Sequence, residues 1–191
     1  VSTDYVFNGH SYIPYKEEDA VSPVSVYGKT KRQGEEELLR LCPQTSIIVR
    51  TAWLYSEYGN NFMKTMLRLG AERSRLSVVF DQIGTPTYAY DLASALFAIL
   101  DQSIKGLFVP GIFHYTNEGV CSWYDFASKI MKLAGLSAKV FPIESAEYPT
   151  KAARPHYSVL NKKRIKSVYH LEIPHWEESL ALCLDRWKKI E

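Results

Sequence analysis

Tyr27 and Lys31 stand four residues apart in the segment Tyr27-Gly28-Lys29-Thr30-Lys31. On a helix, two residues at this spacing lie on the same face. A phenol has an ordinary pKa of about 10, and a nearby ammonium group favours its ionised form. The pair is therefore suited to act as a tuned acid or base, of the kind that protonates a ketone oxygen while hydride arrives at the carbon.

The spacing alone is a weak signal, because thirteen tyrosines should produce about one such pair by chance. A second pair, Tyr12 and Lys16, encloses Pro14, which opposes a regular helix. From the spacing alone, Tyr27 and Lys31 could equally be two surface residues of a solvated helix without a catalytic role. The residues upstream of this pair favour a catalytic role for Tyr27 and Lys31.

The β-branched and aromatic run from Val1 to Phe7 predicts the end of a strand, and Thr3 lies where that strand is expected to end. Ligands of open parallel sheets sit beyond the carboxyl ends of the strands. A hydroxyl group at Thr3 is therefore placed to hydrogen-bond the same substrate oxygen that Tyr27 would protonate.

The elements that must position these residues alternate between helix and strand. Pro43 ends the first predicted helix, and Ser122 is a plausible N-cap of another. We expect helices over residues 25–41, 61–69, 88–100, 122–133 and 174–187, and strands over 46–50, 76–80, 111–116 and 140–143. This alternation predicts an α/β fold with a mostly parallel sheet. The run Glu35–Glu37 is expected to be a solvated helix face.

Composition narrows the class of protein. The chain has 191 residues, 46% of them hydrophobic, and a net charge of +2, which gives no reason to expect a nucleic-acid partner. No apolar run approaches 20 residues, so no membrane partner is expected. The three cysteines and five histidines show no metal-ligand spacing, so we predict no metal and a cytoplasmic location.

Several segments together resemble the extended short-chain dehydrogenase/reductase family, and within it the dTDP-4-dehydrorhamnose reductase branch. The resemblance covers essentially the whole chain. It rests on S-T-D-Y-V-F-x-G, V-Y-G-K-T-K, R-T-A-W-L-Y, D-Q-I-G-T-P-T, H-Y-T-N-E-G and A-R-P-H-Y-S-V-L. It implies a bacterial enzyme of dTDP-rhamnose and cell-surface polysaccharide biosynthesis that reduces the 4-keto group of dTDP-4-dehydro-L-rhamnose with NADPH or NADH.

The resemblance also implies roles for individual residues. Thr3, Tyr27 and Lys31 would be catalytic, and Tyr27 and Lys31 would also contact the cofactor. The residues expected to bind the dTDP-sugar are Thr3, Asp4, Tyr5, Trp53, Gln82, Thr87 and Arg154. An indole at Trp53 suits the apolar face of a deoxysugar, although a core Trp at the end of a buried strand fits that position equally well. Arg154 is a natural diphosphate partner, or else a solvated loop residue.

The family begins with a strand, a Gly-rich turn and a helix that hold the cofactor diphosphate. No G-x-x-G-x-x-G segment occurs here. We therefore expect the chain to be the C-terminal portion of a reductase, inactive alone, with the cofactor bound mainly by an absent N-terminal half. Residues 1–55 would complete a Rossmann-like doubly wound sheet. Residues 56–191 would form mainly a smaller substrate-binding subdomain, with some segments returning to the sheet.

Two alternatives remain open. A nucleotide-sugar epimerase or dehydratase uses the same Tyr and Lys, but a dehydratase has an Asp-Glu pair where this chain has Asp4 and Tyr5. A non-catalytic regulatory subunit that resembles the partner of methionine adenosyltransferase would keep the S-T-D-Y-V-F and Y-G-K-T-K segments. The oligomeric state is also open, a homodimer included.

Overall fold

The computed structural model describes residues 1–148, 150 and 154–190. Its main sheet has three parallel strands in the order β1-β2-β7. They are β1 (Ser2–Thr3), β2 (Ile47–Thr51) and β7 (Gly111–His114). Thr3 pairs with Thr51, and Val49 pairs with Phe113. The last residue of β1 therefore lies beside the last residue of β2, at the carboxyl edge of the sheet.

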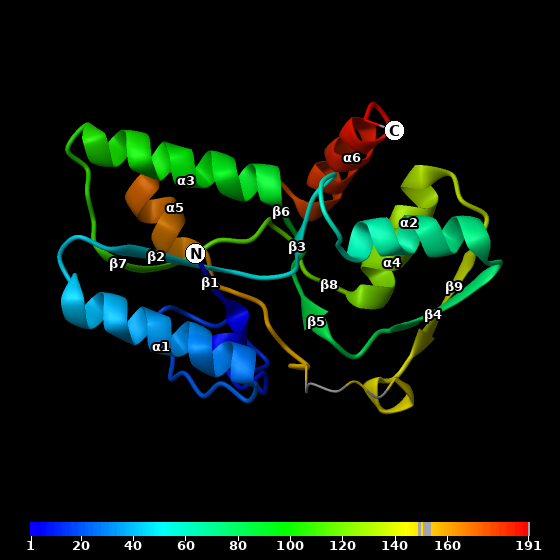
Figure 1. Cartoon of the computed structure of the whole chain (residues 1–191), viewed down its shortest axis with the longest axis horizontal. Helices are drawn as coiled ribbons and strands as arrows, with labels where there is room; N and C mark the ends of the chain where they lie inside the picture. Colours follow the sequence, from blue (N-terminus) through cyan, green and yellow to red (C-terminus); the bar gives the residue numbers. More distant parts are fainter. Residues whose placement is uncertain (149, 151–153, 191) are drawn as a thin grey trace.

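Helices cover both faces of this sheet. Helix α1 (Val26–Leu41) lies on one face, while α3 (Ala89–Ile104) and α5 (Lys163–Tyr169) lie on the other (Figure 1). Apolar side chains of β2, β7, α3 and α5 form one continuous core, which includes Val49, Leu92, Ile99, Phe113, Ile165 and Tyr169. A parallel sheet buried between two helical layers is the doubly wound α/β arrangement.

A second group of elements packs beside the sheet. Strand β4 (Arg75–Val79) pairs in parallel with β9 (Lys139–Ile143). Helices α2 (Phe62–Glu72) and α4 (Trp123–Ala134) pack on this pair, and α6 (Trp176–Trp187) packs on α4 and on strand β6 (Thr87–Tyr88) (Figure 1). Their shared core includes Met63, Leu67, Leu76, Phe126, Ile130 and Leu180. The fold is therefore α/β in both groups, as the alternation in the sequence predicts.

Short elements connect the two groups. Strand β3 (Leu54–Tyr55) pairs in parallel with β6 (Thr87–Tyr88), and β5 (Ile83–Gly84) pairs in antiparallel fashion with β8 (Cys121–Ser122). The described residues also include two 3-10 turns, η1 (Asp4–Val6) and η2 (Ser145–Glu147). Within the described ranges, no helix has the length and apolar character needed to cross a membrane.

The helix predictions are confirmed, with ends within about four residues, and Ser122 caps α4 as expected. The strand predicted to end at Thr3 is confirmed as β1, which ends there because the Thr3 hydroxyl accepts a hydrogen bond from Tyr5 N and starts the turn η1. The solvated face expected for Glu35–Glu37 needs one correction. Glu35 is buried rather than solvated, because it pairs with Arg50. The short helix α5 was not predicted.

Candidate functional site

Thr3 forms the first corner of the site, at the end of β1 and almost fully buried. Its Oγ1 accepts a hydrogen bond from Tyr5 N at 3.2 Å and donates one to Asp4 Oδ1 at 2.9 Å. The hydroxyl group therefore caps η1 and contacts a carboxyl group at the same time. This places Thr3 where the sequence predicts it, at the carboxyl edge of the parallel sheet.

Tyr27 lies in the first turn of α1, and 55% of its side chain is exposed. Ser25 caps this helix, with its Oγ 3.0 Å from Gly28 N. The rings of Tyr27 and Tyr5 meet edge to face, with their centroids 5.8 Å apart. A Cβ atom on Gly28 would overlap the carbonyl oxygen of Tyr5. The glycine thus lets α1 approach η1 closely enough for the two tyrosine rings to touch.

Lys31 lies one turn after Tyr27 on the same helix. Its Nζ donates a hydrogen bond to the carbonyl oxygen of Val1 at 2.7 Å, so the side chain extends toward β1. An ammonium group has three donors, and the two that make no hydrogen bond to a described residue suit the hydroxyl groups of a sugar. Tyr27 and Lys31 therefore lie on the side of α1 that faces β1 and η1.

Asp4 is 3% exposed. Burial raises the pKa of its carboxyl group to about 6, although hydrogen bonds from the hydroxyls of Thr3 and Ser158 lower it. Within the described residues, Oδ2 of Asp4 makes no hydrogen bond of good geometry. The Ser158 hydroxyl donates to Ile83 O at 3.4 Å. A carboxyl group with this pKa exchanges a proton near neutrality.

Trp53 forms the opposite corner of the site. It follows β2 in the left-handed backbone region, with φ of 48°, and its indole stacks on Trp123 with the ring centroids 3.6 Å apart. Gly84 lies against this indole and against the Ser158 hydroxyl, so that a Cβ atom there would overlap both. Ser158 therefore connects the corner at Trp53 with Asp4. The sequence did not point to Trp123, because nothing local marks a residue 70 positions away as a stacking partner.

The remaining predicted residues lie in different surroundings. Gln82 is 7% exposed, and its Nε2 donates to Ser145 Oγ at 2.9 Å. Thr87 has no exposed surface in this conformation, so its role toward a ligand stays a prediction. Burial raises the pKa of Tyr5 above its ordinary value, and the charge of the exposed Arg154 offsets only part of this. The structure thus brings Thr3, Asp4, Tyr5, Tyr27 and Lys31 together, and leaves Gln82 and Thr87 inside the fold.

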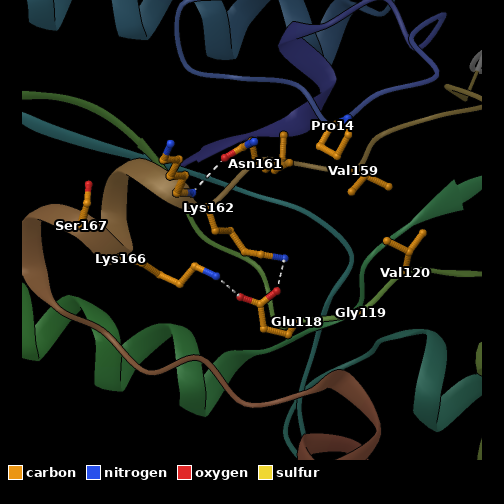
Figure 2. A pocket seen from close by; sticks show the side chains of 11 residues that line it. Pro14, Glu118, Gly119, Val120, Val159, Asn161, Lys162, Lys166 and Ser167 are labelled. Atoms are coloured by element: carbon orange, nitrogen blue, oxygen red, sulfur yellow. Dashed lines mark hydrogen bonds and ion pairs between the residues drawn. The ribbon is translucent and has the colours of Figure 1, made fainter.

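A separate hollow of about 600 Å³ lies beside the loop of Pro14. Glu118 stands in it between two ammonium groups, 2.8 Å from Lys166 Nζ and 3.2 Å from Lys162 Nζ (Figure 2). Burial raises the pKa of Glu118, but the two lysines outweigh it and lower the net value. Lys162 Nζ also donates to Asn117 O at 3.0 Å. These bonds hold α5 to the loop after β7, so the charges already have partners.

The predicted site as a whole therefore offers the phenols of Tyr5 and Tyr27, the ammonium group of Lys31, the hydroxyl of Thr3 and the carboxyl of Asp4 near the carboxyl end of β1. The exposed phenol of Tyr27 has the chemistry of a proton donor, and Lys31 supplies positive charge one turn away. The described residues contain no group of three or more His, Cys, Asp or Glu side chains that converge on a point.

Comparison with known proteins gives concordant matches. The model of the RmlD substrate binding domain matches residues 1–189. The dTDP-4-dehydrorhamnose reductase of Aggregatibacter actinomycetemcomitans is 47% identical over 188 residues, which cover 94% of this chain and 63% of that protein. The Bacillus subtilis spore coat polysaccharide biosynthesis protein SpsK is 45% identical over 180 residues, 94% of this chain and 61% of that protein. The chain thus spans about three fifths of these relatives.

Solved structures agree. The dTDP-4-dehydrorhamnose reductase of Clostridium acetobutylicum superposes with a TM-score of 0.91 at 45% identity, over 98% of this chain and 64% of that one. The Bacillus anthracis reductase in complex with NADP superposes with a TM-score of 0.90 at 41% identity, over 97% of this chain and 64% of that one. A dTDP-glucose 4,6-dehydratase at 17% identity, with a TM-score of 0.79, shows the shared fold alone. The match over nearly all its residues shows that the chain belongs to the RmlD substrate-binding domain family.

Proposed function

We propose that this chain supplies the proton donor and the sugar-nucleotide-binding surface of a reductase that converts dTDP-4-dehydro-L-rhamnose into dTDP-L-rhamnose. The observation that carries the proposal is the position of Tyr5, which contacts Thr3 through a hydrogen bond and Tyr27 through its ring. Thr3 and Tyr27, which are 24 positions apart in the sequence, therefore both lie next to Tyr5 at one edge of the sheet. The reductases named above, at 41–47% identity, support the choice of substrate.

In the proposed reaction, the C4 carbon of the sugar gains a hydride, and the electron pair of the carbonyl double bond moves onto oxygen. That oxygen takes the phenolic proton of Tyr27, so the ketone becomes an alcohol. The charge of Lys31 stabilises the phenolate that remains. Thr3 orients the carbonyl. NADPH or NADH, when bound, supplies the hydride.

The donors of Lys31 and Tyr27 fit the hydroxyl groups of the nicotinamide ribose, and we propose that they contact it there. The Bacillus anthracis reductase was solved with NADP, which favours a nicotinamide cofactor for this chain as well. The division at residue 55, with catalysis before it and mainly sugar-nucleotide binding after it, is part of the same proposal. A cytoplasmic site of action accords with a nucleotide-sugar substrate.

For the dTDP-sugar, we propose contacts with both corners of the site. The exposed part of the Trp53 indole would pack on the deoxysugar, and Arg154 would pair with the diphosphate. Asp4 and Tyr5 line the reacting end. Gln82 and Thr87 would contribute only after a local rearrangement, since both are buried.

The test is reduction of dTDP-4-dehydro-L-rhamnose by the full-length protein, followed as loss of NADPH absorbance. Tyr27→Phe should lower kcat by about 10²–10⁴-fold, the usual loss when a general acid is removed. Tyr12→Phe is the matched control, because Tyr12 belongs to the other Tyr-x-x-x-Lys pair, is 89% exposed and lies outside any helix. Its turnover should stay within twofold of the unsubstituted protein.

A loss below tenfold in Tyr27→Phe would show that another group donates the proton. Absence of turnover in the unsubstituted protein, together with tight binding to a methionine adenosyltransferase, would favour the regulatory-subunit alternative. Release of a dehydrated or epimerised nucleotide sugar would favour the other alternative.

A further inference from the structure

We propose that Asp4 is a positioning residue whose proton decides whether the Thr3 hydroxyl can donate a hydrogen bond to the keto oxygen of the sugar. This inference rests on the proposed function and extends it. Asp4 acts through Thr3 and does not itself transfer a proton to the substrate.

Thr3 has a limited capacity for hydrogen bonds. A threonine hydroxyl has one hydrogen to donate and two lone pairs to accept with. One lone pair accepts from Tyr5 N, and the hydrogen points to Asp4 Oδ1 at 2.9 Å. An ionised carboxylate can only accept hydrogen bonds. While Asp4 is ionised, the single hydrogen of Thr3 is therefore held by Asp4, and Thr3 has none to offer a ketone.

Protonation of Asp4 reverses this bond. A protonated Oδ1 can donate its hydrogen to the second lone pair of Thr3, which accepts no hydrogen bond from the described residues. The bond from Tyr5 N is unchanged, and the hydroxyl hydrogen of Thr3 is released to point toward the substrate. Every donor and acceptor of Thr3 is then used, with the keto oxygen as the new acceptor.

The surroundings of Asp4 make the neutral form accessible. The carboxyl group is 3% exposed, and within the described residues Oδ2 makes no hydrogen bond of good geometry. A buried charge without full hydrogen bonding is costly. The groups that face it are the hydroxyls of Thr3 and Ser158 and the phenol of Tyr5. Tyr27 and the cation of Arg154 act on the phenol of Tyr5.

Burial is the largest effect, and it raises the pKa of Asp4 to about 6. The neutral form is therefore dominant at pH 5 and reduced to roughly 1% at pH 8. Because the neutral form frees Thr3, turnover should increase as the pH falls through this range. If ionised Asp4 were the active form, turnover would instead decrease as the pH falls through this range.

The experiment measures kcat for reduction of dTDP-4-dehydro-L-rhamnose by the full-length protein between pH 5 and pH 8. We expect kcat to fall by about tenfold or more across this range, as the loss of one hydrogen bond to developing charge implies. Asp4→Asn should remove the pH step, because its amide carries a donor for Thr3 at every pH. Thr3→Val should have a low kcat at every pH, with no pH step. Thr3→Ser keeps the hydroxyl and should retain the pH step in kcat.

A second measurement does not depend on turnover. In protein labelled with ¹³C-aspartate, the carboxyl signal that is missing in Asp4→Asn reports the titration of Asp4. Thr3→Val should raise the pKa of this signal, because the hydroxyl that stabilises the carboxylate is gone. Thermal unfolding of each variant checks that the fold is intact.

A pH step that persists in Asp4→Asn, or an Asp4 signal that titrates below pH 4.5, would overturn the inference. Failure of the proposed function looks different. In that case no variant, nor the unsubstituted protein, reduces the sugar at any pH, while the coupling between Thr3 and Asp4 is still visible in the carboxyl signal.

Discussion

Arg50 of β2 and Glu35 of α1 form a bidentate ion pair that is almost completely buried. Nε of Arg50 lies 2.8 Å from Oε1 of Glu35, and Nη2 lies 2.7 Å from Oε2, with side-chain exposures of 1% and 2%. Glu35 is one turn beyond Lys31 and two turns beyond Tyr27 on the same helix. The ion pair therefore joins the helix of the proposed catalytic residues to the sheet.

Glu35→Gln should lower the free energy of unfolding by about 3–5 kcal/mol, because it leaves the buried Arg50 charge without its partner. Urea unfolding measures this directly. The matched control is Glu37→Gln, since Glu37 pairs with Arg40 on the exposed side of α1 and such pairs contribute about 1 kcal/mol or less. Equal effects of the two substitutions would contradict the importance of burial.

The same pair predicts a pH dependence. Burial raises the pKa of Glu35, but the hydrogen bonds and charge of Arg50 outweigh it, so the net pKa is lowered from the ordinary value of 4.5. A lowered folded pKa means that the stabilisation is complete above about pH 4.5 and is lost as the pH falls through the folded value. Stability measured below pH 4.5 should therefore fall less steeply in Glu35→Gln than in the unsubstituted protein.

Substitution of two glycines of α1 by alanine should change the stability of the protein in opposite directions. Gly34 has open space around the position of a Cβ atom, so Gly34→Ala should stabilise the helix by about 0.5–1 kcal/mol. At Gly28, a Cβ atom would overlap the backbone of Tyr5, so Gly28→Ala should move α1 away from η1. We expect a lower melting temperature and a large loss of kcat in Gly28→Ala alone. Unchanged activity would mean that the contact between Tyr5 and Tyr27 is dispensable.

Local signals in the sequence predicted much of the fold. Ser122 and Asp125 illustrate this: the Ser122 hydroxyl accepts from Asp125 N at 3.1 Å, and the Asp125 carboxylate accepts from Ser122 N at 2.9 Å. Both partners lie within one turn, so the pattern is visible in four residues. The approach of Thr3 to the N-terminus of α1 also followed from a local motif together with the rule for parallel sheets.

Long-range pairings could not be predicted. Glu35 looks like part of an acidic surface run, and only the packing of α1 on β2 shows that Arg50 neutralises it. The coupling of Thr3 to Asp4 depends on the turn η1, which begins where β propensity alone would continue the strand. Burial of Gln82 and Thr87 depends on contacts with distant segments, which single-residue character does not reveal.

The capping box of α4 gives a prediction on stability alone. Ser122→Ala removes the hydroxyl that accepts from Asp125 N and should lower the free energy of unfolding by about 1 kcal/mol. Asp125→Asn keeps an acceptor for Ser122 N and should lower the free energy of unfolding by less than Ser122→Ala does. Thermal unfolding of both variants tests this, and a larger loss in Asp125→Asn would show that the carboxylate charge near the helix N-terminus matters more than the cap.

Trp53 permits a test that separates packing, backbone strain and substrate binding. Trp53→Ala removes the indole that stacks on Trp123 and should lower the free energy of unfolding by about 2 kcal/mol or more. Alanine would still have to adopt the positive φ of this position, which costs an L-residue roughly 1–2 kcal/mol and costs glycine almost nothing. Trp53→Gly should therefore be about 1 kcal/mol more stable than Trp53→Ala, although it has the smaller side chain.

Kinetics of the same variants then isolate the sugar contact. If the indole packs on the deoxysugar, both small substitutions should raise KM for the dTDP-sugar with little change in kcat, because this packing is present in the ground state and the transition state alike. Trp53→Phe keeps an aromatic ring against Trp123 and should raise KM least. A KM that is unchanged in all three variants, alongside the expected losses of stability, would assign Trp53 to the core that surrounds Trp123 and remove it from the sugar site.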